Sequence, residues 1–142
     1  MKKKVKGSRS WSRILAVQAI YLMIFNQDAK EQKVIKDLLN NKEIKNIADK
    51  NFFSQLVKTT QGKDKEIIKE IVNLVTEKKF NKMESLIKVI LKLGFCEILY
   101  FNDIPSKVSI AEYNKVADSF LNKKEVGLIN NILDKISKNN NG

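Results

Sequence analysis

Basic and aromatic side chains near the amino terminus are the residues of this sequence best suited to chemistry. The first 13 residues hold no acid and six basic residues, which are Lys2, Lys3, Lys4, Lys6, Arg9 and Arg13. Trp11, Gln18 and Tyr21 lie among or shortly after them. Cations pair with phosphates, aromatic rings stack on unpaired bases, and amides read base edges. This mixture predicts contact with single-stranded RNA rather than with duplex DNA.

A purely structural interpretation fits the same residues. Trp11 and Tyr21 would then belong to the hydrophobic core, and the lysines would form a solvated tail. Composition alone does not choose between these two interpretations.

Several kinds of catalytic and metal site are excluded by the residue types that are missing. Histidine is absent and Cys96 is the only cysteine. This excludes Ser-His-Asp and Cys-His catalysis, histidine metal sites, paired-cysteine motifs and an internal disulfide. The sequence also lacks a glycine-rich loop that would cradle a phosphate. We therefore expect no metal, no cofactor and no enzymatic activity.

The net charge is +11, from 27 basic and 16 acidic residues. Such an excess favours polyanionic partners, either nucleic acid or an anionic membrane surface. All but two of the basic residues are lysines, a bias that a low-GC genome would also produce. The distribution is therefore more informative than the total, and the first 13 residues alone supply +6.

The basic start followed by the apolar residues 14–25 has two interpretations. One is a secretory signal peptide, but Gln18 interrupts the apolar run and Asn26 and Gln27 stand where small residues should precede a cleavage site. The other, which we favour, is an amphipathic first helix of a cytoplasmic domain, capped by Ser8 or Ser10. Its apolar face would carry Trp11, Ile14, Leu15, Val17, Tyr21, Leu22 and Phe25. No apolar run reaches the length of a membrane span, so we expect no membrane partner.

The rest of the chain predicts one all-α domain over residues 1–142, with residues 1–8 as a flexible basic arm. Apolar residues recur at helical spacing, whereas strand-like alternation, sequence repeats and Pro/Gly/Ser-rich linkers are absent. About seven helices are expected: the first, five further ones over residues 31–49, 51–60, 65–77, 83–101 and from Ser109, and a last one from Asn122.

Residues 83–101 predict a helix that is buried nearly all round, because few of their side chains are polar. Glu97 lies on this helix and needs a hydrogen bond or a cation, so we expect it to tie the helix to a neighbour. Cys96, on the same helix, is expected to be a small buried apolar residue.

Capping boxes are predicted where a Ser or Asn stands three residues before a Glu. Ser109 with Glu112, and Asn122 with Glu125, fit this pattern and would open the last two helices.

Four segments together resemble the NusB family of transcription antitermination factors, in their order and spacing. They are residues 16–21 (AVQAIY), 91–98 (LKLGFCEI), 103–110 (DIPSKVSI) and 129–135 (INNILDK). The resemblance spans essentially the whole chain and implies an all-helical fold of two small orthogonal bundles. Members of the family bind the boxA element of ribosomal RNA leaders as single-stranded RNA. They do so with the small-subunit ribosomal protein NusE and join an antitermination complex with RNA polymerase.

The resemblance also implies which residues face RNA. The arginine-rich start of the family's first helix falls on Arg9 and Arg13, and its A-x-Q-x-L-Y motif gives Gln18 and Tyr21. The Pro-x-Lys block and the closing motif add two further positions, which are Lys107 and Asn130. Charge reversal at Arg9 and Arg13 should then weaken RNA binding without changing the melting temperature.

Several positions depart from the family pattern: Ser10 and Trp11 stand where the family tends to have further arginines, and Ile14 stands where it usually has an acid. Leu128 stands where the family often has an aromatic residue before the closing motif. Asn131 replaces the usual glycine after Asn130, and Ala111 replaces an asparagine of the third segment. Two alternatives stay open for this reason: a NusB-like interaction module with weakened RNA specificity, or a homodimer. A third is an RNA methyltransferase carrying a NusB-like domain, and the missing cysteine pair argues against it.

Overall fold

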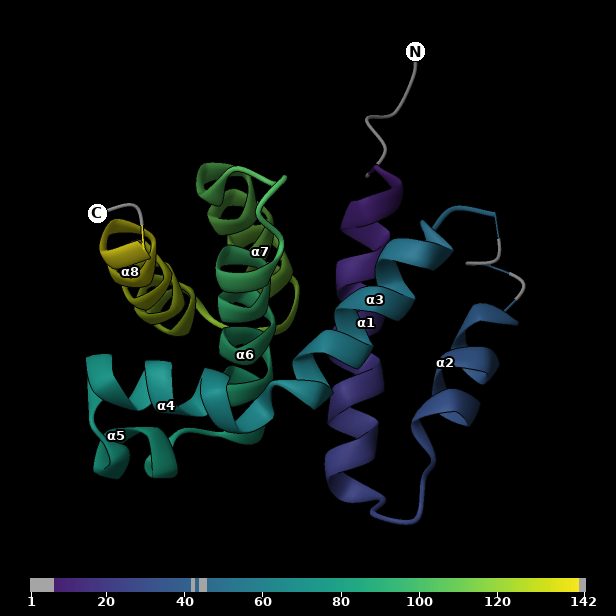
Figure 1. Cartoon of the computed structure of the whole chain (residues 1–142), viewed down its shortest axis with the longest axis horizontal. Coiled ribbons are helices and arrows are strands. Elements are labelled where there is room, and N and C mark those ends of the chain that lie inside the picture. The colour runs from purple at the N-terminus through teal and green to yellow at the C-terminus, as the bar shows by residue number, and fades with distance from the viewer. Residues whose placement is uncertain (1–6, 42, 44–45, 141–142) are drawn as a thin grey trace. The chain divides into compact units, whose positions relative to one another are not determined.

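Eight helices make up most of residues 7–41, 43 and 46–140, which are the residues that the computed structural model describes (Figure 1). The prediction of an all-α fold is confirmed. The chain forms two compact units, Met1–Lys58 and Thr59–Gly142, and the boundary falls inside the third helix. The helices are α1 (Ser8–Phe25), α2 (Glu31–Leu39), α3 (Lys50–Gly62), α4 (Asp64–Val75), α5 (Glu77–Lys82), α6 (Ser85–Tyr100), α7 (Ser106–Phe120) and α8 (Lys123–Asn140).

The first unit is built around α1, which contacts α2 and is joined to the start of α3 (Figure 1). Ala16 and Ala19 are completely buried on α1, and such small side chains allow neighbouring helices to approach closely. The other buried side chains of this core are Leu15, Val17, Ile20, Val34, Ile35, Phe52, Phe53, Leu56 and Val57.

The predicted apolar face of the first helix is only partly correct. Tyr21, Leu22 and Phe25 are exposed rather than buried. Gln18 is the only polar residue between Ile14 and Phe25, and the packing of α1 buries only part of this apolar surface. The predicted cap by Ser8 or Ser10 is also wrong, because α1 begins at Ser8 and its N-cap residue is Gly7, which offers no side chain. Ser8, expected as the last residue of a flexible arm, is the first residue of α1, and residues 1–6 lie outside the described residues.

The helix expected over residues 31–49 is shorter than predicted. α2 ends at Leu39, and Ile47, expected at helical spacing, is exposed beyond it. Ile44, the other apolar residue of that stretch, lies outside the described residues. Asparagines at positions 40 and 41 follow the helix, and asparagine favours turns over helix interiors.

The second unit is organised around α6, which contacts α4, α7 and α8. Ten of its 16 residues are buried, as the sequence predicted for residues 83–101. Cys96 is among them, and burial raises the pKa of its thiol to about 12. The thiol therefore stays protonated at neutral pH and packs as a small apolar group, as expected.

Two polar ties fix α6 to its neighbours. The Oγ of Ser109 on α7 donates a hydrogen bond of 2.9 Å to Oε1 of the fully buried Glu97. On the other side, Nζ of Lys92 lies 2.9 Å from Oδ1 of Asp64 at the start of α4. The expected tie from Glu97 to a neighbouring helix is therefore confirmed.

The predicted capping box of Ser109 and Glu112 is wrong, because α7 begins one turn earlier, at Ser106, and Ser109 binds Glu97 instead. Pro105 stands at the N-cap of this helix with φ of −59°, a value already suited to helix entry. The second box is confirmed, with Asn122 N–H donating to Glu125 Oε1 at 3.1 Å and Glu125 N–H donating to Asn122 Oδ1 at 2.9 Å.

Helix α5 was not predicted, since its six residues are too few to show a helical period. Thr76 precedes it with φ of 80°, and its Oγ1 accepts a hydrogen bond from Lys79 N–H. This extra helix explains why eight helices are found among the described residues and about seven were expected.

Replacing Ser109 by Ala should destabilise the protein by about 2 kcal/mol, because it removes a donor to a buried carboxyl group. Urea denaturation measures this loss. Ser119→Ala is a matched control on the same helix, since Ser119 is exposed and its hydroxyl donates to the carbonyl of Lys115. A change below about 0.5 kcal/mol is expected there. Equal effects of the two substitutions would contradict this role for the Glu97 tie.

Close packing at Gly94 generates a second prediction. A Cβ at this position would lie 2.7 Å from Cδ2 of Leu133, which is fully buried and has no solvent to move into. Gly94→Ala should therefore lower stability by about 1 kcal/mol, since overpacking outweighs the gain in helix propensity. The control is Gly127→Ala on α8. A Cβ at this position would meet no atom of another element within 4 Å, so the substitution should raise stability.

The same substitution tested in a Leu133→Ala background separates the two contributions. Removing the Leu133 side chain removes the clash, so Gly94→Ala should then stabilise the protein in thermal and urea unfolding. Stabilisation by Gly94→Ala in the unmodified protein would contradict the packing argument.

Candidate nucleic-acid interface

The predicted RNA-facing residues divide between the two units. Arg9, Arg13, Gln18 and Tyr21 all lie on α1 in the first unit. The exposed residues Lys107 and Asn130 lie on α7 and α8 in the second unit. The predicted lysines of the arm fall outside the described residues, and these are Lys2, Lys3, Lys4 and Lys6.

Arg9 and Arg13 are brought together on one aromatic ring. Their guanidinium carbons lie 4.5 and 5.0 Å from the centre of the Phe52 ring, at the start of α3. Stacking of guanidinium groups on aromatic rings is favourable and holds the planar groups in place. Two cations one helical turn apart are thus fixed by a residue from a distant part of the sequence.

The two arginines differ in exposure, and this separates their roles. The side chain of Arg9 is 48% exposed, and its Nε lies 3.6 Å from Oδ2 of Asp49. Arg13 is only 3% exposed. An exposed guanidinium can reach a phosphate, whereas a buried one fixes its surroundings. Of the two guanidinium groups, that of Arg9 is therefore open to solvent, and that of Arg13 is buried beside Phe52.

Asp49 organises the junction between α1 and α3. Its carboxyl oxygen Oδ1 accepts a hydrogen bond of 3.0 Å from Phe52 N–H, which caps α3 and holds the aromatic ring in position. Its backbone N–H donates to the Ser8 carbonyl, and its own carbonyl accepts from Ser12 Oγ at 2.7 Å. Sequence reasoning missed Asp49, whose signal is weak: an acid three residues before an aromatic pair.

Further along α1, exposed side chains form a second part of the candidate surface. Gln18 is exposed, Tyr21 is 39% exposed and Phe25 is 65% exposed. The rings of Tyr21 and Phe25 contact each other, with centres 4.8 Å apart and planes tilted by 55°. Phe25 was missed as a surface residue, because its apolar side chain predicted a place in the core. An amide beside two exposed rings can stack with and hydrogen-bond unpaired bases.

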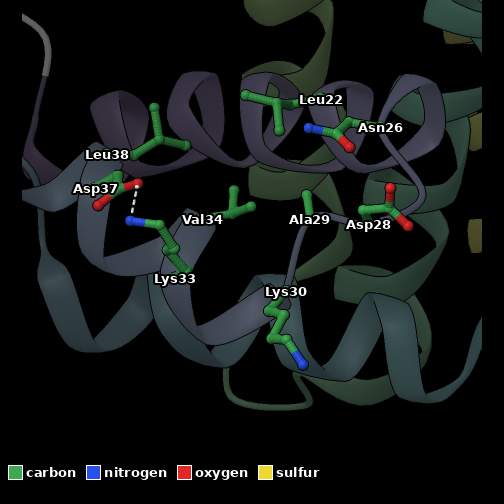
Figure 2. A pocket seen from close by; sticks show the side chains of 9 residues that line it. All are labelled: Leu22, Asn26, Asp28, Ala29, Lys30, Lys33, Val34, Asp37 and Leu38. Carbon is green, nitrogen blue, oxygen red and sulfur yellow. Dashed lines mark hydrogen bonds and ion pairs between the residues drawn. The ribbon is translucent and has the colours of Figure 1, made fainter.

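A pocket of about 460 Å³ lies between the end of α1 and α2 (Figure 2). Figure 2 shows Leu22 of α1 facing a space bordered by Val34 and Leu38 of α2. On its rim Nζ of Lys33 lies 3.2 Å from Oδ2 of Asp37. Two lysines and two aspartates line the pocket, so their charges balance and give it no preference for an anion. The pocket is therefore not part of the candidate interface.

In the second unit, the predicted residues lie on the surface of α7 and α8. Lys107 is exposed in the first turn of α7. Asn130 accepts a hydrogen bond of 2.8 Å from Nδ2 of Asn114, which ties α8 to α7 and leaves the amide nitrogen of Asn130 available. Both residues can therefore contact a ligand without a change in the fold.

Two negative findings hold for the described part of the chain. No group of three or more Cys, Asp or Glu side chains is placed to hold a metal ion. None of its helices is both long and apolar enough to cross a membrane.

The sequence model of the NusB family matches residues 10–138, which is most of the chain. This protein belongs to the NusB family. Its sequence is 36% identical to the transcription antitermination protein NusB of Rickettsia bellii (strain OSU 85-389), over 94% of this chain and 92% of that protein. The resemblance seen in the four sequence segments is therefore confirmed as family membership.

Solved NusB structures share the fold. NusB of T. maritima superposes with a TM-score of 0.80 at 21% identity, covering 94% of this chain and 93% of that chain. A structure of the antitermination factors NusB and NusE in complex with dsRNA gives a TM-score of 0.82 at 18% identity, covering 92% and 96%. This chain therefore has the NusB fold although its sequence is only 21% and 18% identical to those of the two solved chains.

Burial changes the expectation for the two arginines of this protein. Arg13→Ala should destabilise it by about 2 kcal/mol, because it removes a buried side chain that packs on Phe52. Arg9→Ala should cost less than about 1 kcal/mol, since a half-exposed ion pair contributes little. Urea denaturation compares the two. Equal losses of stability in the two variants would contradict a structural difference between Arg9 and Arg13. An unchanged stability of the Arg13 variant would agree with the sequence-based expectation that charge reversal leaves the melting temperature unchanged.

Proposed function

We propose that this protein is a non-enzymatic RNA-binding adaptor of transcription antitermination that works in the cytoplasm. It binds boxA-type single-stranded RNA of ribosomal RNA leaders together with the NusE ribosomal protein and joins RNA polymerase. The observation that carries the proposal is the family match over residues 10–138. The surface of α1 supports it with a specific chemistry.

On α1, phosphate contact and base contact are assigned to different residues. Arg9 holds an RNA phosphate, and its orientation is set by the Phe52 ring and by Asp49. Gln18 hydrogen-bonds a base edge, and the Tyr21–Phe25 ring pair stacks on unpaired bases. Exposed rings favour a single strand, because bases within a duplex are already stacked on each other.

The basic arm and the second unit add contacts of a simpler kind. Lys2, Lys3, Lys4 and Lys6 act as point charges toward the RNA backbone, without the bidentate geometry of arginine. In the second unit, Lys107 supplies one more cation and Asn130 one more amide donor. Among the described residues Lys107 has no ion-pair partner, so RNA does not have to displace an acid from it.

The role of NusE is supported by a relative. NusB and NusE occur together with RNA in a solved structure whose NusB chain shares this fold. A scaffolding protein of this kind needs no catalytic group, in keeping with a sequence that contains no histidine and a single buried cysteine.

A second candidate, an interaction module with weakened RNA specificity, is favoured by Leu128. An aliphatic side chain, 40% exposed on α8, stands where the family often has an aromatic residue. Loss of an aromatic face removes about 1–3 kcal/mol of stacking for the base concerned. Equal affinity for boxA-like and scrambled RNA would support this second candidate over the first.

Tyr21→Ala should weaken binding of a boxA-like RNA by about fivefold or more, because each stacked base contributes about 1–3 kcal/mol. Fluorescence anisotropy measures the change. Tyr100→Ala is a matched control, since Tyr100 is 36% exposed and lies outside the proposed interface. It should leave the affinity unchanged. If both variants bind as the unmodified protein does, the α1 surface is not the RNA site.

A further inference from the structure

A groove of about 430 Å³ between α2 and α3 carries three lysines and no acid. The lysines are Lys36 on α2 and Lys50 and Lys58 on α3. All three are exposed, and the groove lies entirely within the first unit. It is separate from the residues assigned above to RNA contact.

The arrangement of these side chains is regular. Lys50, Ser54 and Lys58 follow one another at four-residue steps, so they lie on one side of α3 with a rise of about 6 Å per step. Lys36 stands on the other helix, and Ile35 and Leu39 line the groove between them. Ile35 is buried and Leu39 half-buried. Cations therefore border the groove, and aliphatic side chains form part of its lining.

The positive charge of the groove is not neutralised within the described part of the chain. Lys36, Lys50 and Lys58 have no carboxylate within ion-pair distance there, whereas the neighbouring Lys33 pairs with Asp37. Lys50 is also the first residue of α3, where the helix dipole disfavours a cation. These charges repel one another and contribute nothing evident to folding. A lysine-rich composition accounts for the lysines but not for a groove lining that contains no acid among the described residues.

We propose that this groove binds the phosphate backbone of single-stranded RNA, as a contact additional to the surface of α1. The three ammonium groups pair with successive phosphates, the Ser54 hydroxyl donates to a phosphate oxygen, and the aliphatic lining packs against ribose and base faces. Lys50 and Lys58 lie about 12 Å apart along α3 with the Ser54 hydroxyl between them, so an extended polyanion that follows the helix can contact all three side chains. An acidic protein is disfavoured, because the groove offers no exposed large apolar side chain as an anchor. The choice of RNA rests on the proposed function.

The test replaces the groove lysines together, as Lys36→Gln, Lys50→Gln and Lys58→Gln. The matched control is Lys65→Gln, Lys69→Gln and Lys124→Gln, three exposed lysines outside the groove whose loss changes the net charge equally. Both variants are titrated against a boxA-like RNA extended at both ends, at several salt concentrations. The groove variant should bind at least tenfold more weakly at low salt. Its slope of log K against log salt should be shallower by about 2, at about 0.7 per lost contact.

The control variant should keep the slope of the unmodified protein. Equal effects of the two variants would mean that only total charge matters, and an unchanged slope in the groove variant would mean that RNA does not enter the groove. Either result overturns the proposal, as does a groove variant that loses affinity for NusE but not for RNA. Circular dichroism melting checks that both variants remain folded, which is expected because all six side chains are exposed.

The groove and the proposed function can fail separately. If Tyr21→Ala weakens RNA binding and the groove variant does not, the groove proposal falls while the α1 surface stands. If the unmodified protein does not distinguish boxA-like from scrambled RNA but the groove variant still loses slope, the groove stands as an RNA contact and the boxA function falls.

Discussion

The stacking of two arginines on Phe52 is the interaction on which the candidate interface depends. It joins the start of α1 to the start of α3, and Asp49 reinforces it through its carboxylate and its backbone. Because Arg13 is buried in this junction, the first turns of α1 are held in place, and Arg9 projects from them. A cation fixed before binding loses less conformational entropy when it meets a phosphate. Arg13 stabilises the junction and Arg9, one turn earlier on α1, is proposed to bind RNA, so a change that loosens the junction should also weaken RNA binding.

The second unit is held together by a different kind of interaction. Helix α6 is buried nearly all round, and its buried polar group, Glu97, is satisfied by Ser109 from α7. A buried carboxyl group that must meet its donor favours one register of α7 against α6 over others. α7 and α8 are in turn tied by Asn114 and Asn130, so the residues predicted to face RNA in this unit stand on a fixed pair of helices.

The sequence was sufficient for the fold class, the buried helix, the need of Glu97 for a partner and the last capping box, because each depends on local spacing or on burial. The sequence did not predict the burial and contacts of residues whose neighbours come from distant segments of the chain. The burial of Arg13 depends on Phe52, and the exposure of Phe25 depends on how much of α1 its small unit covers. Ser109 was misassigned as a cap, because the same hydroxyl can bond a backbone N–H or a side chain from another helix. The groove lysines carried no local signal, since they are gathered from two helices.

The central claim is that this chain recognises RNA by sequence and does so together with a protein partner. The most direct measurement is an anisotropy titration of boxA-like and scrambled single-stranded RNA with the full chain, alone and with NusE present. We predict tighter binding of the boxA-like RNA and a larger preference when NusE is added. Equal affinity for both RNAs, unaffected by NusE and lost alike as salt rises, would contradict it and leave only an electrostatic attraction.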